Sequence, residues 1–180
     1  MDQLEQLLPN TWLLRLKKLE DSRGFFVKTV SKSALKEVGC NFELQEEYYS
    51  TSKKDVIRGM HFQTPPHDHI KIVYCALGSV LDVLLDLRSG PSYGKFSSVI
   101  LDASDPSLLI IPKGVAHGFK ALADDSLMVY KTSTQYEPKN DAGILWSSFG
   151  FDWGLKNPIL SSRDVSHPML QEFQTPFSIS

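Results

Sequence analysis

The chain has 180 residues, a formal net charge of −2 at pH 7 and 42% hydrophobic residues. This length is typical of one domain that buries its own core, so we expect a single domain over residues 1–180. The scattered, nearly balanced charge argues against nucleic-acid and membrane-surface binding. It leaves open a small phosphate-bearing ligand, which needs only a local group of Arg and Lys.

The two cysteines, Cys40 and Cys75, have neither a CxxC motif nor a zinc-type spacing. We expect both to be reduced thiols. The first residues lack the positive and apolar regions of a secretory signal, and no apolar run reaches the length of a membrane span. These features predict a cytoplasmic protein.

One short helix is predicted near the N-terminus, over residues 31–39, with Ser31 as its N-cap and Gly39 at its end. Residues 137–153 are mixed in character and are assigned only loosely. The tail after Leu170 has no periodic pattern, so it either is loose or packs on a neighbouring subunit.

Short apolar runs separated by Gly, Pro, Asp and Ser predict most of the remaining structure as strands. The clearest strands are expected at 80–87, 96–101, 108–111 and 127–132, with turns at 88–94 and 102–106. Many short strands with little helix predict an all-β fold, either an antiparallel sandwich or a jelly-roll barrel.

Residues 80–87 have a period of two, with Leu81, Val83, Leu85 and Leu87 on one face and Asp82, Leu84 and Asp86 on a more polar face. Asp82 and the side chain of Lys71 either face the inside of a barrel or face solvent. The first alternative predicts a polar ligand pocket, because a buried charge needs a partner or a shifted pKa.

The most informative motif is Arg58-Gly59-Met60-His61-Phe62-Gln63, followed ten residues after its histidine by Lys71. A base next to a cation suits the removal of a proton from a carbon beside a ketone, because the cation stabilises the enolate oxygen. A second histidine, His117, follows a predicted turn at 112–114. Gly59 is expected to let the backbone approach a ligand closely.

Two arginines in these regions, Arg23 and Arg58, have the geometry to bind a diphosphate, since guanidinium matches phosphate oxygens in a bidentate manner. The alternative for each arginine is a solvated position on the protein surface. A metal site is a further alternative, built from the H-x-H of His67 and His69 together with His117. Lys71 stands near the place where such a site needs a carboxylate, which argues against a metal.

Taken together, six motifs in order resemble the dTDP-4-dehydrorhamnose 3,5-epimerase family. They are Asp21-x-Arg23-Gly24-x-Phe26, the run from Arg58 to His67, Lys71-Ile72-Val73, the run from Gly78 to Arg88, Ile111-Pro112-x-Gly114-x-Ala116-His117-Gly118-Phe119, and Tyr130-Lys131-x-Ser133-x-x-Tyr136-x-Pro138. Trp146, Asp152-Trp153 and Leu160-Ser161-x-Arg163-Asp164 extend the similarity toward the C-terminus.

The resemblance implies a cupin-type antiparallel jelly-roll barrel that acts as a homodimer, with the N-terminal strands and the C-terminal tail as candidates for packing on the partner. It implies an isomerase that works without metal or organic cofactor on a nucleotide-diphosphate 4-keto-6-deoxyhexose. It also implies the catalytic roles. His61 is the base, Asp164 orients it, Lys71 stabilises the enolate and Tyr130 is the acid.

Further residues are assigned to substrate binding by the same resemblance. Arg23, Arg58 and Arg163 fall where the family holds phosphates, and His117 lines the sugar site. Gln63 belongs to the substrate-binding set, and Tyr136 matches the tyrosine that stacks on the nucleotide base.

The chain departs from the family pattern at the expected nucleotide-binding part of the site. Lys28 stands where the family usually has Glu, and Glu46-Glu47-Tyr48 stands where it has Gln-Asp-Asn. One hypothesis is that the nucleotide or the sugar differs from dTDP-4-keto-6-deoxyglucose. The alternative is neutral drift at the rim of the site.

The predicted function is therefore inversion at C3, C5 or both carbons of a nucleotide-linked 4-ketosugar, in deoxysugar biosynthesis. Three alternatives stay open from the residues alone. They are a 3,4-ketoisomerase in the same kind of barrel, a metal-dependent cupin oxygenase and a sugar-binding module without catalysis.

Overall fold

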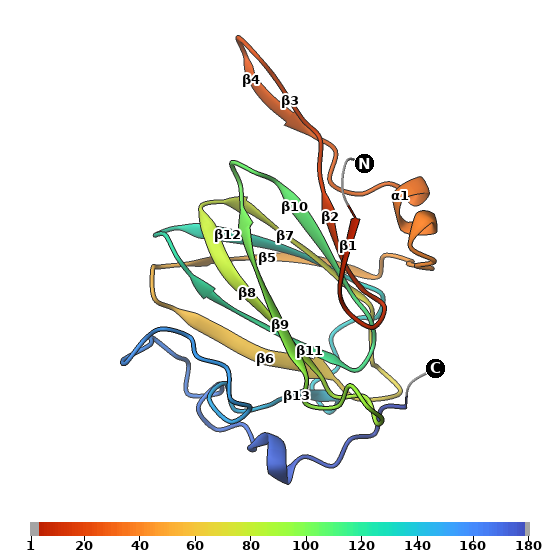
Figure 1. Ribbon diagram of the computed structural model, residues 1–180, viewed down its shortest axis with the longest axis vertical. Helices are drawn as coiled ribbons and strands as arrows, with labels where there is room; N and C mark the ends of the chain where they lie inside the picture. The colour runs from red at the N-terminus through yellow and green to blue at the C-terminus, as the bar shows by residue number, and fades with distance from the viewer. Residues whose placement is uncertain (1–3, 179–180) are drawn as a thin grey trace.

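The structure is a computed structural model that describes residues 4–178. Two antiparallel sheets face each other (Figure 1). The six-stranded sheet has the order β1 (Leu4–Leu8), β2 (Thr11–Arg15), β10 (Ser107–Ile111), β7 (Lys71–Leu77), β12 (Ser126–Thr132) and β5 (Glu46–Ser52). The five-stranded sheet has the order β13 (Asp141–Gly143), β6 (Ile57–Gln63), β11 (Val115–Ala121), β8 (Ser79–Asp86) and β9 (Phe96–Asp102).

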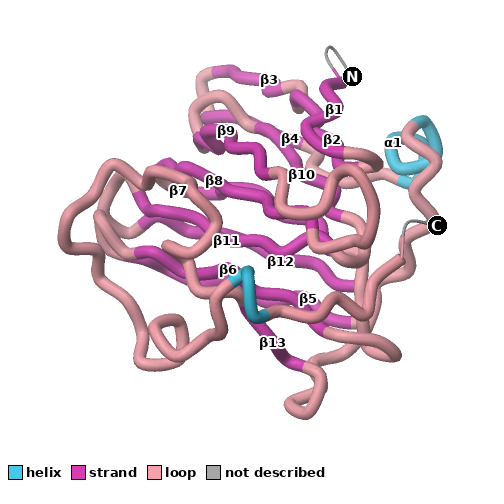
Figure 2. Tube along the Cα trace, turned by 60° about the horizontal axis from the view of Figure 1, so that its bottom comes forward, coloured by secondary structure: helices cyan, strands magenta, loops and turns pink. Residues whose placement is uncertain are grey.

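The remaining elements lie outside these two sheets. A separate hairpin pairs β3 (Lys18–Asp21) with β4 (Gly24–Val27), α1 spans Lys32–Glu37, and a single 3₁₀ turn covers Leu170–Glu172. Figure 2 shows how little of the chain is helical beside the stacked strands. The predicted all-β fold with few short helices is confirmed. Among residues 4–178, no helix has the length and apolarity needed to cross a membrane.

The elements expected from periodicity are found close to their predicted positions. The predicted strands correspond to β8, β9, β10 and β12 with boundaries shifted by a residue or so. The helix begins as expected, because the Ser31 hydroxyl accepts a hydrogen bond from the backbone N–H of Ala34 at 3.2 Å. After Glu37 the chain turns through Gly39, whose φ of 67° suits the residue that follows a helix.

Strand β8 shows which of its two faces meets the interior of the barrel. Leu84 belongs to the apolar cluster between the two sheets, and Asp82 on the same face is fully buried. Val83 and Leu85 point the other way, into a second cluster that includes Trp153. The solvent-facing alternative for Asp82 is therefore wrong, because both faces of the strand are covered.

The covering layer on the outer face is the C-terminal segment. Figure 1 shows it in blue, running past β6 and β13. Phe173 and Phe177 pack edge-to-face on Phe62 with ring centroids 5.3 and 5.7 Å apart. The tail is thus held against its own chain as far as Ser178, and its packing on a partner subunit stays a prediction.

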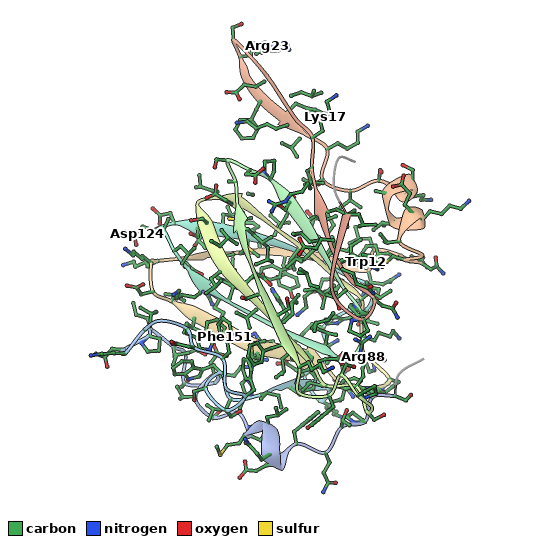
Figure 3. All side chains as sticks on the ribbon, viewed as in Figure 1. Trp12, Lys17, Arg23, Arg88, Asp124 and Phe151 are labelled. Carbon is green, nitrogen blue, oxygen red and sulfur yellow. The ribbon has the colours of Figure 1, made fainter. Side chains whose placement is uncertain are left out.

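The β3–β4 hairpin extends away from both sheets (Figure 1), and Figure 3 places Arg23 at its tip. Its apolar side chains have little cover, since Leu19, Phe25 and Phe26 are 51%, 58% and 59% exposed. An isolated two-stranded hairpin is marginally stable in water. Leu19 and Phe26 are cross-strand partners on one face and Phe25 lies on the other, so both faces of the hairpin leave apolar side chains uncovered.

Candidate active site

A cavity of about 370 Å³ lies between the two sheets. Its walls come from β5, β7 and β12 of one sheet, β6 and β11 of the other, and the loops that follow β12 and β13. The lining residues are Glu46, Tyr48, Ser50, Arg58, His61, Phe62, Gln63, His69, Lys71, His117, Phe119, Tyr130, Thr132, Thr134, Tyr136, Asp141 and Arg163. Most of the residues expected in the site therefore meet at this one cavity.

His61 is paired with a carboxylate that is distant in the sequence. Its Nε2 lies 2.5 Å from Oδ1 of Asp164, which is buried behind the ring and is 103 residues away in the chain. Because the carboxylate accepts the Nε2 proton, Nδ1 is the nitrogen that is left to accept another. The Asp164 backbone N–H donates to the Ser161 hydroxyl at 3.1 Å, which helps to fix the carboxylate.

The surroundings keep His61 neutral. Burial lowers the pKa of His61 below its usual value, against the opposing effect of the hydrogen bond and charge of Asp164. Arg163 and Lys71 lower it further. Burial tends to raise the pKa of Asp164, but the contact with His61 outweighs it and leaves that pKa below its usual range. A neutral imidazole beside an ionised carboxylate is a competent general base.

Lys71 places an ammonium group at the same cavity. Only 6% of the residue is exposed, and among the described residues it forms no ion pair. Burial lowers the pKa of Lys71 to about 8, although Asp82 and Asp141 act in the opposite direction. The ammonium group is thus charged at neutral pH and free to contact a ligand oxygen.

A second histidine–aspartate pair lies at the wall of the cavity. His117 stands directly opposite His61 across β11 and β6, and its Nε2 donates to Oδ2 of Asp82 at 2.7 Å. Both side chains are almost completely buried. Burial raises the pKa of Asp82, while His117 and Lys71 oppose the change. The barrel interior therefore carries a fixed polar network, as the lumen-facing alternative predicted.

Tyr130 faces this pair from the other sheet. Its hydroxyl lies 3.1 Å from the Ser50 hydroxyl, and its ring stacks on Tyr48 with centroids 4.8 Å apart and planes inclined by 14°. Burial raises the pKa of Tyr130, so the phenol stays protonated and can act as an acid. Since β12 and β6 belong to different sheets, Tyr130 and His61 lie on opposite walls of the cavity.

The outer part of the cavity carries the charged binding candidates. Arg163 pairs with Asp141 at 2.7 Å, and the Tyr136 hydroxyl donates to the same carboxylate at 3.2 Å. Arg58 donates to the Ser52 hydroxyl at 3.0 Å. Glu46 accepts the backbone N–H of Tyr136 at 2.7 Å, which ties β5 to the loop after β12.

Gln63 lines the cavity but its amide is used mainly to hold loops. Its Nε2 donates to the backbone carbonyl of His67 at 2.8 Å, and its Oε1 accepts the backbone N–H of Glu137 at 2.7 Å. Thr134 also donates to the His67 carbonyl, at 2.9 Å. The two loops that form the mouth of the cavity are therefore joined through one buried side chain.

Two of the expected substrate-binding residues are not at this cavity. Arg23 sits on the β3–β4 hairpin, where its guanidinium pairs with Asp21 at 2.7 Å and is 88% exposed. Lys28 follows the same hairpin and is also absent from the cavity walls. The substrate-binding roles expected of Arg23 and Lys28 therefore stay predictions.

Gly59 has a different role from the one predicted. A Cβ at this position would lie 2.5 Å from the Cα of Gly118, so glycine is needed here for the close approach of two strands. The pairing of β6 with β11 shifts register here, between His117 and Phe119. This irregularity lets Arg58 and His61, three residues apart, face the same cavity, which a regular strand would not allow.

Several lining residues carried no clear signal in the sequence, among them Ser50, Thr132, Thr134 and Asp141. For His69 the sequence indicates only a place in an H-x-H pattern. In the structure His69, His67 and His117 do not bring their ligand atoms together within the part of the chain that is described. Burial lowers the pKa of His69 to about 3, so it is a neutral wall of the cavity.

The fold and the cavity together define a class of enzyme. It is an antiparallel jelly-roll enzyme suited to removing and returning a proton at a carbon beside a carbonyl, because an imidazole, a phenol and an ammonium group line one cavity.

Comparison with known proteins agrees with this class. The family model of dTDP-4-dehydrorhamnose 3,5-epimerase matches residues 5–172. The chain is 38% identical over 170 residues to the dTDP-4-dehydrorhamnose 3,5-epimerase of Shigella flexneri, covering 92% of this chain and 94% of that protein. The chain belongs to the dTDP-4-dehydrorhamnose 3,5-epimerase family and is an isomerase.

Solved structures show the same relationship. The dTDP-4-dehydrorhamnose 3,5-epimerase of Bacillus anthracis with TDP and PPi bound has a TM-score of 0.88 at 32% identity, covering 92% of this chain and 97% of that chain. The 4-keto-6-deoxy sugar epimerase from the novobiocin biosynthetic gene cluster of Streptomyces spheroides has a TM-score of 0.89 at 31% identity, covering 94% and 88%. The expected cupin-type fold is thereby confirmed.

Proposed function

We propose that this enzyme epimerises a dTDP-linked 4-keto-6-deoxyhexose at C3, C5 or both carbons. The observation that carries the proposal is the placement of His61 and Tyr130 on opposite walls of the cavity, with Lys71 at the same cavity. Inversion needs a proton removed from one face of a carbon and returned to the other. A base and an acid on facing walls supply this without moving the sugar.

The first step is removal of a proton. Nδ1 of His61 takes the hydrogen from C3 or C5, the C–H electron pair becomes the enolate double bond, and the C4 oxygen acquires the negative charge. The Lys71 ammonium group stabilises this oxygen, and Asp164 stabilises the imidazolium that forms. In the second step the Tyr130 hydroxyl gives its proton to the opposite face, which restores the ketone. Protons exchanged with solvent return both groups to their starting states.

The nucleotide end is assigned to Arg58, Arg163, Tyr136 and Tyr48. Two guanidinium groups at the outer part of the cavity suit a diphosphate. Support for dTDP comes from relatives, since a Bacillus anthracis structure holds TDP and one from Legionella pneumophila at 28% identity is a complex with dTDP-4-keto-L-rhamnose. Glu46 and Tyr48 nevertheless depart from the usual family residues, so isothermal titration with dTDP, CDP, GDP and UDP tests the choice of nucleotide.

The proposal extends to a homodimer in which the β3–β4 hairpin of one subunit reaches the cavity of the other. The exposed Phe25 and Phe26 support this contact, as does the separation of Arg23 and Lys28 from the cavity of their own chain. Light scattering should then give twice the chain mass, and Arg23→Ala should weaken nucleotide binding without unfolding the protein. A monomer that turns over normally would contradict this part of the proposal.

The decisive experiment is solvent exchange. Incubation of dTDP-4-keto-6-deoxyglucose with the enzyme in D₂O, followed by NMR, should show deuterium at C3, at C5 or at both, with inversion at the labelled carbon. Transfer of the carbonyl from C4 to C3 would indicate a ketoisomerase instead. A protein that binds the nucleotide sugar but incorporates no deuterium would be a binding module.

A further inference from the structure

A third imidazole lies beside the Asp164–His61 pair. The ring of His167 packs edge-to-face on the ring of His61, with centroids 5.7 Å apart and planes inclined by 71°. Its Nε2 is 3.8 Å from the same Oδ1 of Asp164 that binds His61. This nitrogen is buried and has no hydrogen-bond partner among the described residues. Only 11% of the His167 side chain is exposed.

The backbone provides a slot of the right shape for this ring. Gly143 on β13 is the cross-strand partner of His61 on β6. A Cβ on Gly143 would lie between 2.4 and 2.6 Å from three atoms of the His167 imidazole, so the ring occupies the space that any other side chain would need. The backbone of Gly143 is not in the left-handed region, so its own conformation does not require glycine.

The chain on either side of His167 is also fixed. The Pro168 carbonyl accepts the backbone N–H of Leu145 at 2.8 Å, and the Arg163 carbonyl accepts that of Ser166 at 3.0 Å. The imidazole is therefore held in place from both sides, next to the Asp164 oxygen that binds His61.

We propose that His167 is a positioning residue for the catalytic base, which closes the Asp164–His61 pair to water and fixes the orientation of the His61 ring. This inference rests on the proposed role of His61. It gives the pair a second imidazole wall, which covers the carboxylate oxygen that binds the base.

The electrostatic consequence follows from the groups that face the two rings. His167 is faced by Asp164, His61, Arg163 and Asp141, and His61 is faced by Asp164, Arg163 and Lys71 as well as by His167. A dry wall disfavours the imidazolium form of His61. When the wall is removed and water reaches the His61 ring, the imidazolium is easier to form, and because burial is the largest effect on the pKa of His61, that pKa rises.

The test compares His167→Ala and Gly143→Ala with the control Val165→Ala, an exposed position in the same turn. Deuterium incorporation into dTDP-4-keto-6-deoxyglucose is measured against pH for each. We expect the acidic midpoint of kcat/KM to move upward by about half a pH unit or more in the first two variants and to stay in place in the control. NMR titration of His61 should show the same upward shift in the absence of substrate.

Gly143→Ala keeps every titratable group and only displaces the ring, so it answers the question if His167→Ala does not fold. Unchanged midpoints in a folded His167→Ala or Gly143→Ala protein, by both kinetics and NMR, would overturn the inference. Absence of deuterium incorporation by the wild type would instead refute the proposed function, so the two failures are distinguishable.

Discussion

Replacing the carboxylate behind the base, in Asp164→Asn, is the sharpest test of the mechanism. Asp164 lies 2.5 Å from Nε2 of His61 and is almost fully buried, so solvent does not screen the interaction. The carboxylate contributes most after the proton has moved, when it faces an imidazolium. Asp164 itself is absent from the cavity wall. Its loss should therefore lower kcat and leave KM nearly unchanged.

The size of the effect follows from the strength of the interaction. A hydrogen bond to a charged group contributes about 1.5–3 kcal/mol. At about 1.36 kcal/mol for each factor of ten, kcat should fall by roughly 10- to 160-fold. The pKa of His61, which Asp164 holds up, should fall further, so the acidic limb of kcat/KM should move to lower pH.

The assay is steady-state deuterium incorporation by NMR from pH 5 to 9, with circular dichroism to confirm folding. Asp125→Asn, at an exposed turn with φ of 56°, is the matched control because Asn tolerates that conformation. A loss of less than threefold in kcat for Asp164→Asn, or a loss that appears only in KM, would refute the reasoning.

Three further predictions concern single side chains. Lys71→Met removes a buried charge, so urea titration at pH 7 should show a free energy of unfolding that is higher by about 1–3 kcal/mol. The same change should reduce kcat by about a hundredfold or more, because the enolate loses its cation. In the wild type, activity should decline above a pH of about 8 as Lys71 loses its proton. Tyr130→Phe should still incorporate deuterium but lose inversion, and inversion at a normal rate in NMR would contradict its role as the acid. Gly59→Ala should destabilise the fold by about 3 kcal/mol or more in thermal unfolding, because its φ of 144° and the Gly118 backbone leave no room for a methyl group, and an unchanged Tm would disprove that account.

The linkage for Lys71 has a definite sign. Its folded pKa of about 8 lies below the ordinary lysine value of 10.5, so the folded state binds fewer protons than the unfolded state between these values. The stability penalty from this group is therefore fully present below pH 8 and disappears as the pH rises toward 10.5. Lys71→Met should remove that dependence.

Local pattern alone was sufficient for β8, β9, β10 and β12 and for the helix. The alternation at residues 80–87, the N-cap at Ser31 and the turn residues each act over a few positions, so their physical cause is contained in the local sequence. The proximity of His61 and Lys71 in the sequence likewise indicated the proton chemistry, because a base and a cation suit an enolate whichever fold carries them.

Only the tertiary structure decided which face of each strand is inside and which distant groups meet. Alternation defines two faces of β8 but does not say that the C-terminal segment covers the apolar one and leaves Asp82 to the barrel. The Asp164–His61 contact spans 103 residues, and the shared cavity of Arg58 and His61 depends on a strand irregularity at Gly59. These contacts depend on strand order and register, which are properties of the whole packed chain, and the place of His167 in the slot above Gly143 is set in the same way.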